Sequence, residues 1–139
     1  MRVYLDSNVF ISFVREEIDF KFNLLGTDSE NFFIKAKSSG DTILVSGLFF
    51  KEIFHVLSLP EKDILLELKN LGLIVEVIRN PPEERLVSEI CRSCNLHRTD
   101  SIHVATALEN KADLIVTWNK RDFCKTERFV RCLSPADFS

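Results

Sequence analysis

Short apolar runs alternate along the chain with longer stretches whose apolar residues recur every three or four positions. The short runs are rich in aliphatic and β-branched residues and predict five strands, Val3–Leu5, Thr42–Ser46, Ile74–Ile78, Leu114–Thr117 and Phe129–Leu133. The longer stretches predict six helices, Ser7–Glu17, Ser29–Ser38, Leu48–Leu57, Glu61–Leu71, Pro82–Cys94 and Thr99–Lys111. This alternation favours an α/β fold with a largely parallel sheet.

Length and composition point to a single globular domain over residues 1–139, because a chain of this size can bury a complete core. Hydrophobic residues make up 45% and charged residues 28%, which is the balance of a folded globular protein. The apolar runs are too short to cross a bilayer, and Asp6 interrupts the first run too early for a signal peptide. We therefore expect a cytoplasmic protein with no membrane partner.

The net charge of −3 excludes a general nucleic-acid binder with a broadly basic surface. Charge is nevertheless uneven, since the segment from Lys111 to Cys132 carries six Lys or Arg residues against three acids. A local basic patch can hold phosphates while acids elsewhere gather cations. Among the four cysteines, Cys91 and Cys94 have a CxxC spacing, but no second pair completes a zinc site, and core packing is the favoured interpretation.

Acidic residues occur where predicted strands end, the edge at which open parallel sheets bind ligands. Asp6 directly follows the first strand, Glu52 lies among six apolar residues after the second, and Asp100 begins a later helix. Asp122 follows the fourth strand within a polar turn that also contains Asn119. Carboxylates gathered at one rim repel each other, so a bound divalent cation is the natural resolution. Oxygen ligands favour Mg²⁺ or Mn²⁺, and no Cys or His is positioned to indicate zinc.

Each acid also has a structural interpretation. Asp6 can act as a helix N-cap, and Asp100 can be favoured by the helix dipole. Asp122 can be an ordinary turn acid. Glu52 has the weakest such alternative, because an acid among apolar neighbours is costly unless it is paired, neutral or bound to a metal. The three histidines, His55, His97 and His103, are expected to be structural or exposed rather than ligands or general bases.

Three segments, VYLDSNVFI, ILVSGLFFKEIFHVL and HRTDSIHVATALENKADLIVTWNKRDF, resemble the PIN-domain nucleases and most closely the VapC-like toxins of toxin–antitoxin pairs. The resemblance implies a PIN-like three-layer α/β/α sandwich with a mostly parallel five-stranded sheet. It also implies Mg²⁺- or Mn²⁺-dependent cleavage of RNA by an acidic site made of Asp6, Glu52 and Asp100. A position that is often Asp in the family is Asn119 here, so the fourth site residue is either Asn119, as a neutral oxygen ligand, or Asp122.

Further residues are candidates around this site. Ser7, Thr117 and Asn119 are placed to orient a carboxylate or a water. Basic residues that can contact RNA phosphates, or can simply form a solvated surface, are Arg15, Lys51, Arg98, Lys120 and Arg121.

The favoured function is an endoribonuclease that hydrolyses single-stranded RNA as the toxin of a toxin–antitoxin system. An antitoxin would insert an Arg or Lys into the acidic pocket. An alternative is an RNA- or protein-binding module with a weakened metal site, which Asn119 keeps open. A haloacid-dehalogenase-like phosphatase is disfavoured because Asn8 replaces the second Asp that such enzymes need. The twelve phenylalanines suggest an aromatic core, with the excess available for a dimer seam or a partner groove, and we expect a homodimer.

Overall fold

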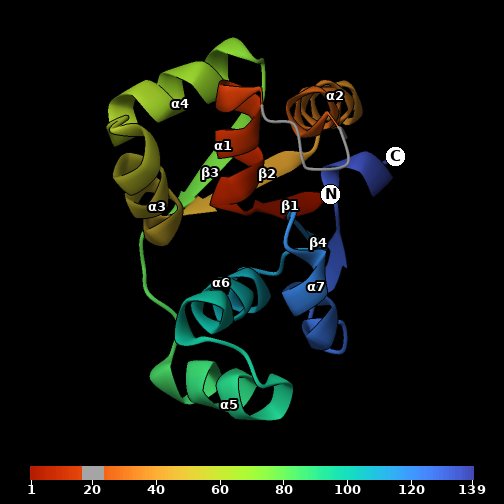
Figure 1. The fold of residues 1–139 in the computed structure, drawn as a ribbon. Coiled ribbons are helices and arrows are strands. Elements are labelled where there is room, and N and C mark those ends of the chain that lie inside the picture. Colours follow the sequence, from red (N-terminus) through yellow and green to blue (C-terminus); the bar gives the residue numbers. More distant parts are fainter. Residues whose placement is uncertain (17–23) are drawn as a thin grey trace.

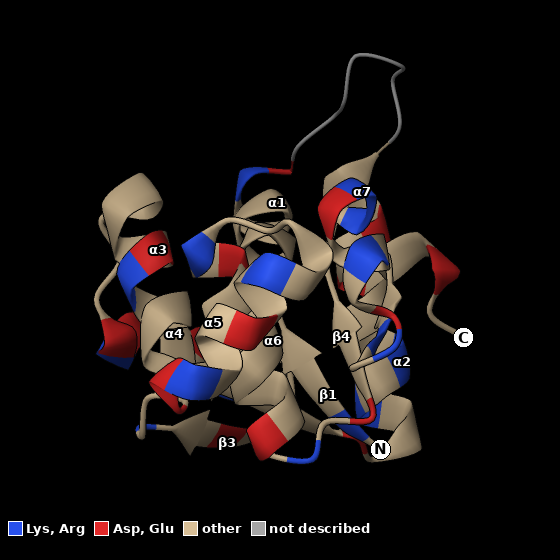
Figure 2. Cartoon of the chain, turned by 90° about the horizontal axis from the view of Figure 1, so that it is seen from below, with Lys and Arg blue, Asp and Glu red and all other residues tan. Residues whose placement is uncertain are grey.

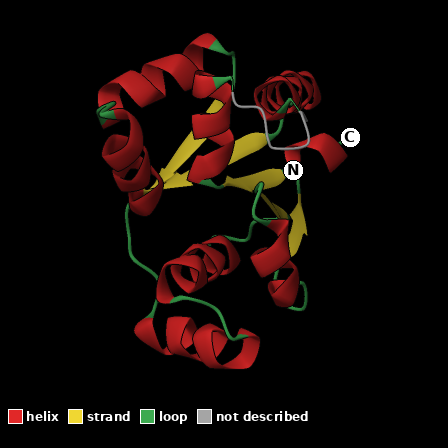
Figure 3. Ribbon diagram, viewed as in Figure 1, coloured by secondary structure: helices red, strands yellow, loops and turns green. Residues whose placement is uncertain are grey.

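The computed structural model describes residues 1–16 and 24–139, and a five-stranded sheet lies at its centre (Figure 3). The strands are β1 (Arg2–Leu5), β2 (Thr42–Ser46), β3 (Ile74–Ile78), β4 (Leu114–Val116) and β5 (Arg131–Leu133). Their order across the sheet is β3-β2-β1-β4-β5, and all four pairings are parallel. The prediction of a parallel α/β sheet is therefore confirmed.

Helices cover both faces of the sheet, which makes the three layers that the sequence predicts. They are α1 (Ser7–Arg15), α2 (Leu25–Ser39), α3 (Gly47–Leu57), α4 (Glu61–Asn70), α5 (Glu84–Cys94), α6 (Arg98–Glu109) and α7 (Lys120–Phe123). Figure 1 shows α1 to α4 on one face and α5, α6 and α7 on the other. Two buried clusters follow this division, because strand side chains alternate between the faces. In β1, for example, Val3 and Leu5 pack in the first cluster and Tyr4 in the second.

Several predicted boundaries are wrong, each for a local reason. Strand β5 begins at Arg131 rather than Phe129, because the amides of Phe129 and Val130 both bond the carbonyl of Thr126 in a turn. Helix α5 begins at Glu84 rather than Pro82, since the carbonyl of Glu83 accepts its first helical bonds.

Further differences concern helix ends and one short helix. Helix α6 ends at Glu109 because Lys111 adopts a left-handed backbone conformation with φ of 56°. The predicted end of the first helix, Glu17, lies outside the described residues. Helix α7 and the 3-10 turn at Cys124–Thr126 were not predicted, because their polar sequence carries no apolar periodicity.

The phenylalanines serve mainly as core. Those that are buried are Phe10, Phe32, Phe33, Phe49, Phe50, Phe123 and Phe138, whereas Phe54 is 57% exposed. Phe20 and Phe22 lie outside the described residues. All four cysteines are free, and Cys94 is buried, in agreement with a packing role. None of the helices within residues 1–16 and 24–139 combines the length and hydropathy that a membrane crossing requires.

Candidate metal site

Asp6 lies at the carboxyl end of the central strand β1, where two neighbouring residues fix both of its carboxylate oxygens. Leu5 pairs with Val116 across β1 and β4, so the next residues on each strand, Asp6 and Thr117, also lie side by side. The Thr117 hydroxyl donates to Asp6 Oδ2 at 2.7 Å, and the Ser7 hydroxyl lies 3.4 Å from Oδ1. Asp6 occupies the N-cap position of α1, but its side chain makes no capping hydrogen bond. The carboxylate is therefore turned toward the sheet edge rather than used for capping.

Thr117 is itself held by the two segments around it. Its hydroxyl oxygen accepts from the Asn8 side-chain amide at 3.3 Å and from the Asn119 backbone amide at 2.9 Å. The other end of the Asn8 amide accepts from the Trp118 backbone at 3.1 Å. These bonds join the start of α1 to the end of β4, so the Thr117 hydroxyl has little freedom to turn away from Asp6.

Glu52 projects from the second turn of α3, at the margin of the buried face formed by Phe49 and Ile53. Its side chain is 29% exposed, and its Oε1 accepts from Ser7 Oγ at 2.9 Å and from His103 Nε2 at 2.9 Å. Burial opposes ionisation of Glu52, but the hydrogen bonds from His103 and Ser7, with the charge of His103, lower its pKa. The carboxylate form is thus the one that this environment stabilises.

His103 lies at the centre of a buried polar chain that starts on β1 and ends at Glu52. Its Nδ1 is 2.6 Å from the Tyr4 hydroxyl, and that hydroxyl is 2.9 Å from Ser46 Oγ at the end of β2. Burial favours the neutral imidazole, but the hydrogen bond to Glu52 and the charges of Asp6, Glu52 and Asp100 raise the pKa of His103. Burial likewise raises the pKa of Tyr4 well above its ordinary value, so this hydroxyl stays neutral.

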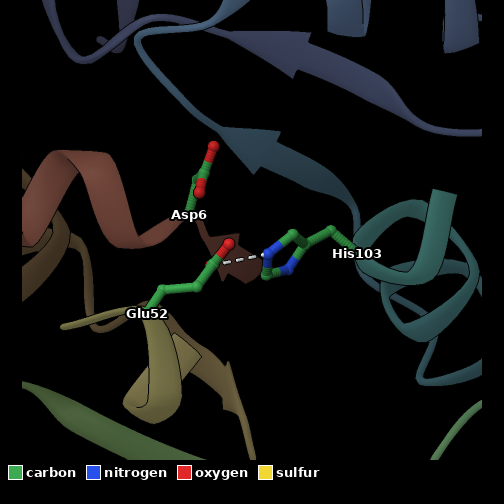
Figure 4. Close-up of side chains that lie close together, drawn as sticks. All are labelled: Asp6, Glu52 and His103. Carbon is green, nitrogen blue, oxygen red and sulfur yellow. Dashed lines mark hydrogen bonds and ion pairs between the residues drawn. The ribbon is translucent and has the colours of Figure 1, made fainter. Parts of the chain in front are cut away.

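The side chains of Asp6, Glu52 and His103 lie close together, extending from the end of β1, from α3 and from α6 (Figure 4). One ligand atom from each lies within 4.8 Å of the others, which is close enough for a single ion to meet all three. The expected structural role of His103 therefore includes a direct hydrogen bond to a candidate site carboxylate, that of Glu52. A signal for His103 was present in the sequence, because it follows Asp100 by three residues and such pairs share one side of a helix.

Asp100 does not join this three-residue group, but its charge acts on the same site. Partial burial and the neighbouring charges of Asp6 and Asp122 raise the pKa of Asp100, which His103 and His97 only partly offset. Asp122 is partly buried on α7, where its Oδ2 accepts from the side-chain amide of Asn119 at 3.1 Å. The choice between Asn119 and Asp122 for the fourth site position stays a prediction, and the two side chains are hydrogen-bonded to each other.

Three basic residues singled out from the sequence have different surroundings. Arg98 is exposed and forms a two-pronged ion pair with Glu84. Lys120 lies 3.2 Å from Asp137, and Arg121 is exposed on α7. Helix α7 carries acidic and basic residues together, as Figure 2 shows. The rim of the site is therefore mixed in charge rather than a continuous basic patch.

The donor set fits a hard divalent cation. Asp6 and Glu52 supply carboxylate oxygens, and the hydroxyls of Ser7 and Thr117 hold these carboxylates in place while Asp100 and Asp122 add negative charge nearby. Both ring nitrogens of His103 already have partners, so His103 positions Glu52 in this arrangement. Burial and, after it, the charges of Asp6 and Asp122 raise the pKa of Asp100, and a bound cation would offset these like charges.

We expect Asp100→Asn to raise the melting temperature of the protein in EDTA at pH 7. A carboxyl whose pKa is raised on folding opposes folding once the pH exceeds that pKa, and the neutral amide removes this cost. The matched control is Asp63→Asn, since Asp63 is an exposed acid in the first turn of α4. Both variants lose the same favourable helix-dipole interaction, so a melting temperature for Asp100→Asn no higher than that of Asp63→Asn would contradict the prediction.

Comparisons with known proteins agree with this fold. The PIN domain family model matches residues 3–128. A chain of VapBC2 from Rickettsia felis, crystallised with a DNA fragment from their promoter, is 16% identical, with a TM-score of 0.59 over 96% of this chain and 98% of that chain. A PilT N-terminus domain protein from the hyperthermophilic archaeon Sulfolobus solfataricus P2 is 16% identical, with a TM-score of 0.54 over 99% of this chain and 90% of that chain. The sequences of curated proteins give no significant match. The structural similarities show the fold, and the family model spans most of the sequence, so the chain belongs to the PIN domain family.

Proposed function

We propose that this protein is a metal-dependent endoribonuclease that hydrolyses single-stranded RNA. The observation that carries the proposal is the convergence of Asp6, Glu52 and His103 within 4.8 Å at the carboxyl edge of a PIN-domain sheet. Parallel α/β sheets bind their ligands at this edge. Negative charge from Asp100 and Asp122 reaches the same place, which suits a site that works with a cation.

Asp6, Glu52 and Asp100 would hold Mg²⁺ or Mn²⁺, with the side-chain oxygen of Asn119 as a further ligand. When bound, such an ion lowers the pKa of water and neutralises charge on a phosphodiester. The protein's own residues prepare the site for it: Thr117 and Ser7 fix the two oxygens of Asp6. His103 holds Oε1 of Glu52, so Oε2 is the oxygen available to a ligand. Asp122 orients Asn119 through its amide nitrogen, which leaves Oδ1 for the cation.

Lys120, Arg121 and Arg98 would contact RNA phosphates at the rim. Lys120 and Arg98 are exposed and held by Asp137 and Glu84, so their cationic groups are already positioned on the surface. Such contacts place a strand without reading its sequence.

We also propose that the protein is the toxin of a toxin–antitoxin pair and works as a homodimer. The fold is similar to that of a VapBC2 chain, whose structure was determined with promoter DNA. The carboxylates of Asp6, Glu52 and Asp100 are complementary in charge to an inserted Arg or Lys of an antitoxin. The exposed Phe54 on α3 is apolar surface of the kind that a second subunit or an antitoxin covers.

A binding module without hydrolytic activity is the second candidate, because Asn119 stands where the family often has Asp. Loss of one negative charge weakens the hold of the site on a cation. Calorimetric titration separates the two functions, since a module that has lost its metal site takes up no Mn²⁺ at millimolar concentration.

The proposed activity is tested by incubating the purified protein with end-labelled single-stranded RNA of random sequence in EDTA, Mg²⁺ or Mn²⁺. We expect cleavage with either metal and none in EDTA, because the acidic site repels the phosphodiester until a cation is bound. Single-stranded DNA of the same design tests the choice of RNA. Absence of cleavage in all three buffers, with circular dichroism showing intact helices, would contradict the proposal.

A further inference from the structure

A second pocket opens beside the candidate metal site, between α3, α6 and the segment that joins β3 to α5. Its volume is about 420 Å³, within the range of pockets that hold small molecules and groups. Its lining includes Gly47, Leu48, Lys51, Arg79, Pro82 and Ile102. Figure 1 shows the joining segment running from the α3 side of the sheet to the α5 side. The pocket therefore lies at the boundary between the two helical layers.

Helices α3 and α6 border both the pocket and the metal site. Lys51 lines the pocket and directly precedes Glu52 on α3, and Ile102 lines it and directly precedes His103 on α6. The Ser46 hydroxyl, also in the lining, is 2.9 Å from the Tyr4 hydroxyl that bonds His103. If one ligand strand bound at both places, the group in this pocket would therefore be only a short length of that strand away from the group held at Asp6 and Glu52.

The lining combines apolar side chains with positive charge. Leu48, Pro82 and Ile102 supply the apolar part, and Lys51 is an exposed cation. The guanidinium of Arg79 is held by two bonds from Glu61, at 2.6 and 2.7 Å, and lies 6.0 Å from the centre of the Phe50 ring. A guanidinium plane fixed in this way is a surface on which unpaired bases stack.

Gly47 lines the pocket without a side chain of its own. A Cβ atom built at this position meets nothing within 4 Å, and Gly47 is not among the glycines with positive φ. Its backbone conformation is therefore available to any residue, and the missing side chain leaves space rather than relieving strain. A larger side chain at position 47 would fill the pocket without disturbing the elements around it.

We propose that this pocket binds one unpaired base of the RNA strand, next to the phosphodiester held at the acidic site. The inference rests on the proposed ribonuclease function. In it, the base contacts Leu48, Arg79 and Ile102, and an adjoining phosphate contacts Lys51. A protein partner is a poorer occupant, because a volume of about 420 Å³ holds one small group rather than a helix or a strand.

The test uses an RNA that the wild-type protein cleaves at one known bond, and compares wild type with Gly47→Leu. We expect Gly47→Leu to raise KM for this RNA about tenfold, the size of one lost stacking contact, with a smaller change in kcat. Affinity for Mn²⁺, measured by calorimetry without RNA, should be unchanged. Ser38→Leu, which places the same side chain at an exposed position of α2, is the control and should cleave like wild type.

A second measurement needs no variant of the protein. Abasic nucleotides are placed singly at each position of the RNA, and one position near the cleaved bond should raise the wild-type KM by a similar factor. Gly47→Leu should be insensitive at that same position. Three results would overturn the base pocket while leaving the proposed ribonuclease function in place. They are an equal effect of abasic nucleotides on the wild type at all positions, a wild-type KM in Gly47→Leu, and a loss of Mn²⁺ affinity in that variant. Failure of the wild type to cleave any RNA would instead overturn the proposed function itself.

Discussion

Asp6→Asn is expected to lower the rate of RNA cleavage by about 100-fold or more, the loss that follows when several kcal/mol of charge stabilisation are removed from a metal site. Asp6 lies at the end of the central strand, and both of its oxygens are fixed by Thr117 and Ser7. The amide keeps the size of the side chain but removes its charge and one acceptor oxygen. The measurement is the initial rate of cleavage of single-stranded RNA at saturating Mn²⁺.

The control for this prediction is Asp113→Asn, which makes the same chemical change just before β4 begins. Asp113 is exposed and accepts a hydrogen bond from the backbone amide of Arg2 at the start of β1, the edge opposite the acidic site. We expect this variant to cleave RNA at the wild-type rate. Equal rates for wild type and Asp6→Asn would remove Asp6 from the catalytic account.

His103→Ala is expected to reduce the free energy of unfolding by roughly 3 kcal/mol, through a cavity and through lost partners for Tyr4 and Glu52. The His103 side chain is only 2% exposed, so water cannot readily replace its two hydrogen bonds. Urea denaturation in EDTA measures the loss without interference from a bound metal. RNA cleavage should also fall, because Glu52 would no longer be held in position.

The stabilisation by the Glu52–His103 pair should depend on pH in a defined direction. Because the pKa of His103 is raised on folding, protonated His103 stabilises the folded state. This stabilisation is fully present below the ordinary histidine pKa of 6.5 and is lost as the pH rises through the pKa of His103 in the folded protein. The lowered pKa of Glu52 gives stability that is complete above its ordinary value of 4.5 and is lost as pH falls through the folded pKa. The pair therefore contributes most between pH 4.5 and 6.5.

The difference in unfolding free energy between wild type and His103→Ala should accordingly be larger at pH 5.5 than at pH 8.5. These pH values lie about one unit below and about two units above the ordinary histidine pKa. His55→Ala is the matched control, because His55 is an exposed histidine on α3 and should change stability little at either pH. A difference that grows as the pH rises would show that His103 is held neutral rather than charged.

Much of the fold follows from local patterns in the sequence. Strands β2 and β3 were predicted to the residue, because each is a compact apolar run between polar or glycine-containing joints. The parallel α/β arrangement follows from the alternation of strands with amphipathic helices, whereas the three layers were implied by the resemblance to the PIN-domain nucleases. The beginning of β5 and the short helix α7 could not be predicted in this way, since they depend on turn hydrogen bonds such as those to the carbonyl of Thr126.

The candidate site was only partly accessible from the sequence. Asp6 and Glu52 could be placed at one rim because both follow parallel strands, and the structure brings them together through Ser7. The part played by His103 depends on the hydroxyl of Tyr4 from another strand, and pairings between distant segments leave no trace in local periodicity. The hydrogen bond between Asn119 and Asp122 could not be predicted from local periodicity either, because it requires the turn of α7.

Calorimetric titration of Mn²⁺ into the wild-type protein and into Asp6→Asn tests most directly whether these side chains form one cation site. The account predicts saturable uptake by wild type, and an affinity at least about tenfold weaker when a charged ligand is lost. Circular dichroism on both proteins verifies that the comparison is between folded chains. Wild-type protein that takes up no Mn²⁺ at millimolar concentration, or Asp6→Asn that binds it equally well, would contradict the account.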